Sequence, residues 1–226
     1  MDNIQRAKEI KFQSIDELTR KRHRYLVDGD ICYHWRTYIS KGDFKVYDTN
    51  NVIENFKKEL PAQGAPLHYK NKAIKQLAKE FFEIISKNEQ RIEYIKNSTF
   101  IPIPPSAKKG EKKYDDRLLR LLYTVSDLLK LPLDIREVIS NRVSVPPSHK
   151  SEKRLSQDDL LSNYMINEDL CNKLHKRIII FDDVITAGSH YKAMQKTLLQ
   201  HPNFSSKKII GFFIARAVNP NYNTTL

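Results

Sequence analysis

Two adjacent carboxylates, Asp182 and Asp183, directly follow an apolar run at positions 178–181, and a small-residue segment at 186–189 comes next. Carboxylate oxygens can accept hydrogen bonds from the hydroxyl groups of a sugar. A loop of small residues lets its backbone N–H groups surround a phosphate, and a helix that begins there adds the positive end of its dipole. The residue types and their order therefore predict a site for a phosphorylated sugar.

A buried strand and an amphipathic helix must position those groups. Four consecutive apolar residues are typical of a parallel strand that is buried on both faces. Beyond the loop, Tyr191, Met194 and Leu198 are spaced i, i+3 and i+7, which predicts a helix with one apolar side. In open α/β sheets, ligands bind at the carboxyl ends of the strands, where the two carboxylates stand. The alternative is a generic strand–loop–helix crossover that carries the two acids for no chemical reason.

The composition is that of an ordinary globular protein. Its 226 residues, of which 40% are hydrophobic and 29% charged, suffice for one domain with a full core and a small appendage. There is no apolar run of about 18 residues and no apolar signal-peptide core near the start, so we expect no membrane partner and a cytoplasmic location. Neither Cys32 nor Cys171 stands in a Cys and His arrangement that resembles a zinc site, which favours incidental thiols.

The net charge of +12 suits anionic ligands, either nucleic acid or phosphorylated small molecules. The charge does not distinguish between these two classes, and a solvated basic surface accounts for part of it. The six glycines form neither a Gly-x-Gly-x-x-Gly motif nor a Walker A loop. The sequence therefore excludes the dinucleotide-binding and P-loop classes that depend on those motifs.

Further elements are expected before and after the carboxylate pair. Positions 31–39 are rich in β-branched and aromatic residues and predict a strand that forms a β-hairpin with 44–47, outside the main sheet. The apolar spacing predicts helices over 50–60 and 71–97. Another buried strand is expected at 208–215.

A proline-stiffened loop ends the strand predicted at Thr99-Phe-Ile-Pro-Ile-Pro-Pro-Ser106. Four lysines and Gly110 follow, and they can meet an anion as point charges beside a closely approaching backbone. Asp115 is the predicted N-cap of the next helix, and its neighbour Asp116 suits the helix dipole. A weak strand is expected at 135–143, and the polar stretch 144–158 comes after it.

The segment Phe181-Asp-Asp-Val-Ile-Thr-Ala-Gly-Ser-His190 resembles the loop of type I phosphoribosyltransferases that binds phosphoribosyl pyrophosphate (PRPP). That signature is a buried strand, two acidic residues, two apolar residues and then Thr-Thr-Gly-x-Thr or close to it. Ala187 replaces one threonine, and His190 stands where the last threonine is usual. The order of the other segments, with Trp35 in the early hairpin and Pro-Ile-Pro-Pro at a strand end, resembles the ComF-like branch. The N-terminal zinc module of many ComF proteins is missing.

The resemblance implies an α/β type I phosphoribosyltransferase fold, in which helices flank a mainly parallel sheet and a helix and β-hairpin form an N-terminal elaboration. Residues 1–66 would form the elaboration, and residues 67–226 would form the phosphoribosyltransferase core. The stretch 144–158 would correspond to a mobile loop that closes over PRPP and shields the reacting sugar from water. The expected partners are PRPP and an unknown nitrogenous acceptor, and a homodimer is left open.

By the same resemblance, Asp182 and Asp183 are the candidate catalytic residues and would bind the ribose 2′- and 3′-hydroxyls. Asp183, or a residue near it, would also steady the positive charge that develops. The 5′-phosphate would be held by Thr186, Ala187, Gly188, Ser189 and His190. The candidates for pyrophosphate are Ser106, Lys108, Lys109, Arg117, Lys150 and Arg154. A solvated loop and an intrahelical salt bridge are the alternatives for the lysines and for Arg117. Mg²⁺ is the expected cofactor and would enter with PRPP, with the two aspartates as the candidates for direct contact.

Three functions are compatible with this sequence. The first is transfer of phosphoribosyl from PRPP to a nitrogenous base or amine, with release of pyrophosphate. The second is a non-catalytic module that senses PRPP or a nucleotide. The third is a ComF-like, competence-associated protein that processes DNA and uses the positive charge to bind nucleic acid.

Overall fold

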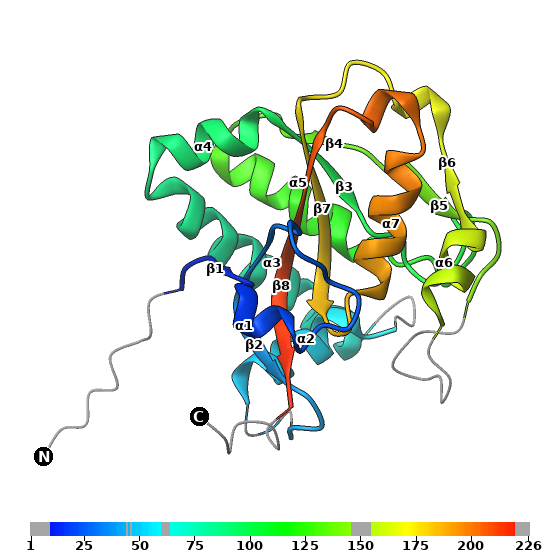
Figure 1. The fold of residues 1–226 in the computed structure, drawn as a ribbon. Coiled ribbons are helices and arrows are strands. Elements are labelled where there is room, and N and C mark those ends of the chain that lie inside the picture. The colour runs from blue at the N-terminus through cyan, green and yellow to red at the C-terminus, as the bar shows by residue number, and fades with distance from the viewer. Residues whose placement is uncertain (1–9, 44, 46, 60–63, 146–154, 220–226) are drawn as a thin grey trace, which may run out of the picture.

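A six-stranded, mostly parallel sheet forms the centre of the molecule (Figure 1). The computed structural model describes residues 10–43, 45, 47–59, 64–145 and 155–219. In sheet order the strands are β1 (Gln13–Ser14), β2 (Cys32–Ile39), β8 (Lys208–Val218), β7 (Arg177–Ile185), β3 (Ser98–Pro102) and β4 (Asp134–Ile135). Within this sheet β1 alone runs antiparallel to its neighbour. A separate antiparallel pair consists of β5 (Ile139–Asn141) and β6 (Tyr164–Ile166).

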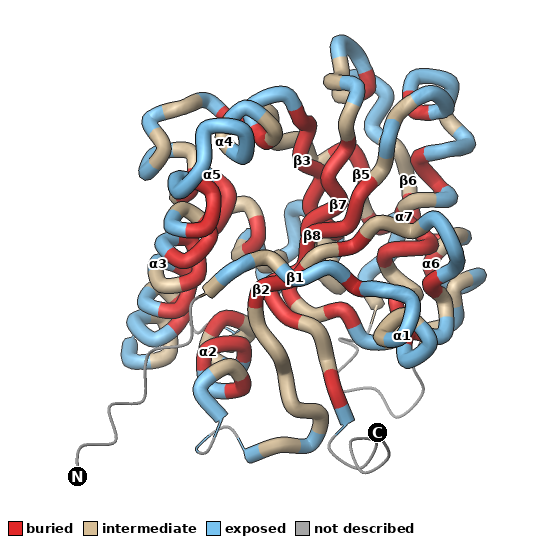
Figure 2. The backbone as a smooth tube through the Cα atoms, turned by 60° about the vertical axis from the view of Figure 1, so that its left-hand side comes forward, coloured by how far each residue is buried: buried red, intermediate tan, exposed pale blue. Residues whose placement is uncertain are grey.

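Helices cover both faces of the sheet (Figures 1 and 2). One face packs against α2 (Asp48–Lys57), α3 (Ala65–Ser86), α4 (Glu89–Lys96) and α5 (Arg117–Leu129). The other face packs against α6 (Gln157–Asn163) and α7 (Ser189–Leu199). The remaining elements are α1 (Glu17–Arg20) and two 3₁₀ turns, η1 (Glu168–Leu170) and η2 (Pro202–Phe204). The protein is therefore an α/β protein with a layered core.

The central strand β7 is buried on both faces, as its apolar run predicts. Ile179 and Phe181 pack with the α2–α5 layer, whereas Ile178 and Ile180 pack with the α7 side. The neighbouring strands β3 and β8 run parallel to β7, and Figure 2 shows all three as buried over much of their length. The carboxyl end of β7 consequently opens between two helical layers, and the acidic pair lies there.

Other predicted elements are confirmed with adjusted ends. The helix predicted at 50–60 is α2, and the strand predicted at 208–215 is β8, which continues to Val218. The helix expected after the small-residue loop is α7, in which Tyr191, Met194 and Leu198 are all buried. None of the described helices combines the length and apolar content that a membrane span requires.

The β-hairpin predicted for 31–39 and 44–47 is wrong. β2 pairs with β1 on one side and with β8 on the other, where Cys32 lies opposite Gly211. After Ile39 the chain turns, with the Gly42 N–H donating to Ile39 O at 2.9 Å, and it enters α2, whose N-cap is Tyr47. Lys45 lies in a turn, and Phe44 and Val46 fall outside the described residues. β2 belongs to the main sheet, and the predicted boundary after residue 66 stays a prediction.

Two predicted elements are each divided in the structure. The helix predicted at 71–97 is interrupted at Asn88, whose side chain accepts the Gln90 N–H at 2.7 Å and so caps α4 after α3 has ended. The strand predicted at 135–143 consists of β4 and β5, which pair with different partners, β3 and β6. In both cases a local break separates residues that share an apolar pattern.

A buried ion pair joins β2 to α3. Glu80 Oε1 lies 2.5 Å from Arg36 Nη2, and the Trp35 indole donates to Glu80 Oε2 at 3.1 Å. The Arg36 and Glu80 side chains are 9% and 8% exposed. Arg36 also contacts the exposed carboxylate of Asp48 at 2.8 Å. The carboxylate of Glu80 is thus the buried counter-charge that allows Arg36 to lie at this interface.

We expect Glu80→Ala to lower the free energy of unfolding by about 3 kcal/mol, because it leaves Arg36 buried with a single exposed partner. Urea denaturation followed by circular dichroism measures this loss. The matched control is Glu83→Ala on the same helix, whose carboxylate is half exposed and 3.8 Å from Lys79. The control should change stability by no more than about 0.5 kcal/mol. Equal losses of unfolding free energy in the two variants would contradict the role of Glu80 as the buried counter-charge of Arg36.

Candidate functional site

The second carboxylate of the pair, Asp183, is buried in a salt bridge with two cations. Lys57 Nζ lies 2.8 Å from Asp183 Oδ1, and Arg117 Nη2 lies 2.7 Å from Asp183 Oδ2. The Asp183 side chain is only 6% exposed. Lys57 comes from α2 and Arg117 from the first turn of α5, so three segments distant in the sequence meet at this carboxylate.

The salt bridge continues into a chain of alternating charges. Arg117 Nη1 lies 2.5 Å from Asp115 Oδ2, which also contacts Lys70 Nζ at 2.8 Å. The buried Lys70 ammonium donates further to the backbone oxygen of Lys58 at 2.9 Å. Asp115 is thus a charge partner, and its Oδ1 atom also accepts the N–H of Arg117, the first residue of α5, at 3.2 Å. The N-cap position itself is occupied by Asp116, whose side chain makes no capping hydrogen bond. Arg117, a candidate for pyrophosphate, is held by Asp183 and Asp115.

The two carboxylates of the pair titrate in opposite directions. Burial alone would raise the pKa of Asp183, but the charges of Lys57 and Arg117 outweigh burial and hold this pKa well below its usual range. For Asp182, burial and the neighbouring charge of Asp183 raise the pKa to about 7. Asp182 is therefore the carboxylate that can exchange a proton near neutral pH.

Asp182 faces a small cavity at the carboxyl ends of β3 and β7. Besides Asp182, this cavity of about 40 Å³ is lined by the proline-rich loop and by the start of α5: Pro102, Ile103, Pro104, Pro105, Tyr114, Asp115, Asp116, Arg117, Leu118 and Leu119, with Glu137 and Ile139. A neighbouring cavity of about 120 Å³ shares Pro104, Tyr114, Glu137 and Ile139 with it. These volumes suit a few water molecules, so a whole sugar diphosphate requires side chains or loops to move.

The small-residue loop turns sharply into α7. Gly188 has a φ of 85°, and a Cβ placed there would lie 3.2 Å from the Leu26 side chain, which favours glycine. The segment before β2 supports the loop from outside: the Tyr25 N–H donates to Ala187 O at 3.0 Å, and His23 Nδ1 is hydrogen-bonded to Thr186 O. The backbone of the loop is thus held by residues from the N-terminal part of the chain.

His190 lies in the first turn of α7 as an uncharged group. Its Nδ1 atom lies 3.1 Å from the Tyr164 hydroxyl of β6. Burial lowers the pKa of His190 to about 4, and burial raises the pKa of Tyr164, so both groups are neutral at pH 7. A neutral imidazole carries one N–H, so the Tyr164 hydroxyl donates to Nδ1 or accepts from it according to the tautomer. An anion at this helix start would meet a neutral imidazole and no added positive charge.

The proline-rich loop and the lysines after it approach the segment that follows β5. Ser106 O accepts the Val145 N–H at 2.9 Å, and the Lys108 N–H donates to Ser144 Oγ at 2.8 Å. The ammonium group of Lys109 is paired with the Glu137 carboxylate. Two further pyrophosphate candidates, Lys150 and Arg154, lie outside the described residues.

The structure brings only some of the predicted site residues together. Asp182 and Arg117 share one cavity, whereas Thr186, Ala187, Gly188, Ser189 and His190 are not part of its lining. Sequence reasoning missed Lys57, Lys70 and Tyr164, because a lysine in a charged helix and a tyrosine in a short strand carry no motif. The one usable signal for Lys57 was its position at the end of a predicted helix whose other side is apolar.

No family model, no curated protein and no solved structure matches this chain. Its class is therefore defined by the structure alone. It is an α/β protein whose mostly parallel sheet, flanked by helices, is compatible with a Rossmann-like fold. An acidic pair stands at the carboxyl end of the central strand, where such sheets bind ligands.

Replacing Lys57 should destabilise the protein through Asp183. We expect Lys57→Ala to cost about 1–3 kcal/mol of unfolding free energy, because Asp183 stays buried with one cation partner in place of two. The neighbouring Lys58 is the control, since among the described residues its ammonium group contacts Asn55 and the Tyr69 ring and no carboxylate. Lys58→Ala should cost clearly less in the same urea titration, and the reverse order would refute the role given to Lys57.

The pH dependence of stability should reveal the raised pKa of Asp182 in the folded protein. Above the ordinary aspartate pKa of 3.8, the unfolded chain loses this proton while the folded protein keeps it until about pH 7. The contribution of Asp182 is therefore complete at acid pH and declines as the pH rises through 7. Asp182→Asn should remove a decline of at least about 1 kcal/mol between pH 5 and pH 8. The control variant Asp116→Asn, which changes an exposed acid, should keep this decline. If Asp182→Asn showed the same pH dependence of stability as the wild type, the raised pKa of Asp182 would be contradicted.

Proposed function

We propose that this chain binds PRPP at the carboxyl end of β7 and transfers its phosphoribosyl group to a nitrogenous base or amine, with release of pyrophosphate. The observation that carries the proposal is the arrangement around β7. An acidic pair lies within the last four residues of the central parallel strand, and a loop with a left-handed Gly188 then leads into α7. This arrangement supports binding of a sugar by the acids and of a phosphate at the helix start.

The two acids have different roles in this proposal. Asp182 makes no ion pair with any described residue and faces the cavity, so it is the acid available to the ribose hydroxyls. Asp183 is occupied by Lys57 and Arg117, and its Oδ1 atom also accepts the Val184 N–H at 2.7 Å. Asp183 acts by fixing the backbone that presents Asp182 and by holding Arg117 at the wall of the cavity.

The helix start supplies the groups for the 5′-phosphate. Ser189 offers a hydroxyl, and His190 offers a neutral imidazole, in place of the threonine that the family usually has. Because His190 brings no charge, binding of the phosphate depends on backbone N–H groups and on the α7 dipole. The affinity for a phosphate should therefore change little between pH 6 and pH 8 on account of His190.

The described acids fit the expected Mg²⁺ only in a limited way. Asp115 and Glu137 line the cavity but already contact Lys70, Arg117 and Lys109. Besides the exposed Asp116, Asp182 is then the one lining carboxylate without such a partner among the described residues. This suits Mg²⁺, which commonly binds through one or two carboxylates together with substrate phosphates. When bound, Mg²⁺ would neutralise charge on the leaving pyrophosphate.

A PRPP-sensing module without turnover is the second candidate, and one observation favours it. Both cations next to Asp183 are engaged by carboxylates, and Lys109 is paired with Glu137. A site whose cations are already neutralised can hold a ligand and still stabilise a leaving pyrophosphate poorly. The distinction between the two candidates lies in product formation and not in binding.

Calorimetric titration with PRPP and Mg²⁺ tests binding. We expect saturable heat for the wild-type protein and at least a tenfold weaker affinity, or about 1.4 kcal/mol, for Asp182→Asn. The control variant Asp116→Asn changes an exposed acid at the edge of the same cavity and should bind as the wild type does. Absence of heat and of a thermal shift with the wild-type protein would refute both candidates.

If PRPP binds, incubation with a panel of bases and amines separates the candidates. Release of pyrophosphate that depends on one acceptor supports transfer, and binding without release supports sensing. The nucleic-acid alternative predicts DNA binding that weakens steeply with salt, independently of Asp182.

A further inference from the structure

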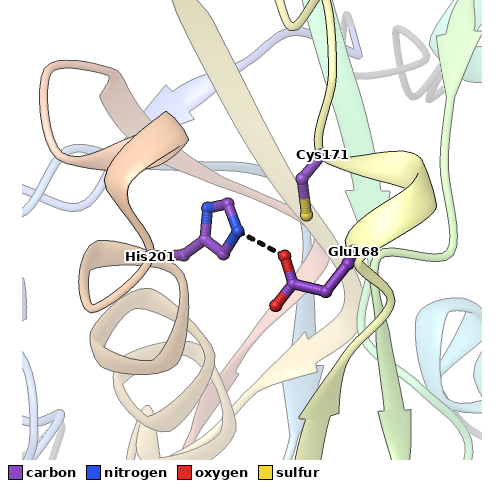
Figure 3. A group of neighbouring side chains, drawn as sticks. All are labelled: Glu168, Cys171 and His201. Atoms are coloured by element: carbon purple, nitrogen blue, oxygen red, sulfur yellow. Dashed lines mark hydrogen bonds and ion pairs between the residues drawn. The ribbon is translucent and has the colours of Figure 1, made fainter.

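Three potential metal ligands meet at the opposite end of the sheet from Asp182. Figure 3 shows Glu168, Cys171 and His201 with their side chains directed toward one another. One ligand atom from each lies within 4.8 Å of the other two, and His201 Nε2 lies 2.7 Å from Glu168 Oε2. Glu168 lies in η1, Cys171 directly follows η1, and His201 directly precedes η2. The two turns come before β7 and β8 in the chain.

The backbone around this cluster is held by hydrogen bonds. The Asn167 N–H donates to Val138 O at 2.8 Å, which ties the start of η1 to the chain before β5. The Asn203 side chain donates to Cys171 O at 2.9 Å and so links η2 to η1. The His201 ring packs edge-on against the buried Phe204. Two separate segments are therefore fixed relative to each other before any ligand binds.

Burial of the three groups is graded from inside to outside. Cys171 is 2% exposed, the His201 side chain is 13% exposed and the Glu168 side chain is 74% exposed. A thiol and an imidazole thus form the floor of the cluster, and an exposed carboxylate closes it on the solvent side. A cation can enter from solvent, and water can occupy a fourth position.

The ligand types select the cation. A cysteine, a histidine and a carboxylate are the set that Zn²⁺ accepts, whereas Mg²⁺ and Ca²⁺ prefer oxygen ligands alone. Two ligands held tetrahedrally at about 2.0–2.3 Å from Zn²⁺ lie roughly 3.3–3.8 Å apart. The separation of 2.7 Å between His201 Nε2 and Glu168 Oε2 is shorter than that range, and rotation of the exposed Glu168 side chain can lengthen it to fit an ion.

We propose that Glu168, Cys171 and His201 form a zinc site with water as the fourth ligand. The proposal is independent of PRPP binding, because about 17 Å of strand separates Arg177 from Asp182. The ion replaces the hydrogen bond between His201 and Glu168 and cross-links η1 to η2. His201 Nδ1 accepts the Asn203 N–H at 3.2 Å. Binding through Nε2 therefore moves the ring proton to Nδ1 and gives up this long contact.

Titration of the reduced full-length protein with Co²⁺ tests the proposal, because a cobalt–thiolate bond gives a charge-transfer band in the near ultraviolet. We expect this band to saturate at one equivalent and to disappear when Zn²⁺ is added. Zn²⁺ should also raise the Tm of the wild-type protein. Absence of a saturable band with the wild-type protein would overturn the proposal.

Three variants and three matched controls assign the ligands. Cys171→Ser should abolish the charge-transfer band, whereas Cys32→Ser should keep it. His201→Ala and Glu168→Gln should weaken Zn²⁺ binding by more than the roughly 10- to 100-fold that loss of an outer-shell partner causes. His175→Ala and Asp169→Asn, which alter nearby groups outside the cluster, should bind Zn²⁺ as the wild type does. Glu168 is exposed, so Glu168→Gln remains informative if the buried variants fail to fold. A band that survives in Cys171→Ser would show adventitious binding and refute the site.

Discussion

The buried carboxylate of Asp183 is the constraint on which the arrangement of the site depends. A lone buried charge would cost several kcal/mol, so the fold must bring cations to it. Lys57 and Arg117 do so from two different helices, and Asp115 and Lys70 extend the same chain of charges. This requirement places the start of α5 and the end of α2 against β7, and it thereby shapes the cavity beside Asp182.

The alternation of side chains along a strand separates the two acids, although they are neighbours in the sequence. Asp183 lies in the layer of α2 and α5, where it is neutralised, and Asp182 is left with a proton that it holds up to about pH 7. One acid maintains the structure and the other is available for chemistry. An adjacent pair can combine these tasks because the anchored backbone positions the remaining carboxylate: the Asp183 N–H donates to Asp182 Oδ1 at 2.7 Å.

Local and strongly periodic features were predictable from the sequence. The run of apolar residues in β7, the helix of Tyr191, Met194 and Leu198, and the position of the acids at the strand end all agree with the structure. The strand pairing of β2 was not predictable. Its partners pair with it from Gln13 in β1 and from Gly211 in β8, and no local pattern encodes such distant pairing. The break at Asn88 did carry a capping signal, which the continuous apolar stripe obscured. Salt-bridge partners such as Lys57 depend on tertiary packing and leave no trace in the spacing of residues.

The pairing of β2 with β8 has a consequence for the order in which the protein can fold. β2 is synthesised early, yet one of its edges is completed by the last described strand of the sheet. Until β8 emerges from the ribosome, Trp35 and its apolar neighbours stand on a strand without its parallel partner. Contacts between distant positions slow folding and leave open edges exposed to other chains. Completion of the sheet must therefore wait until β8 has been synthesised, and the nascent chain can gain from a chaperone during that interval.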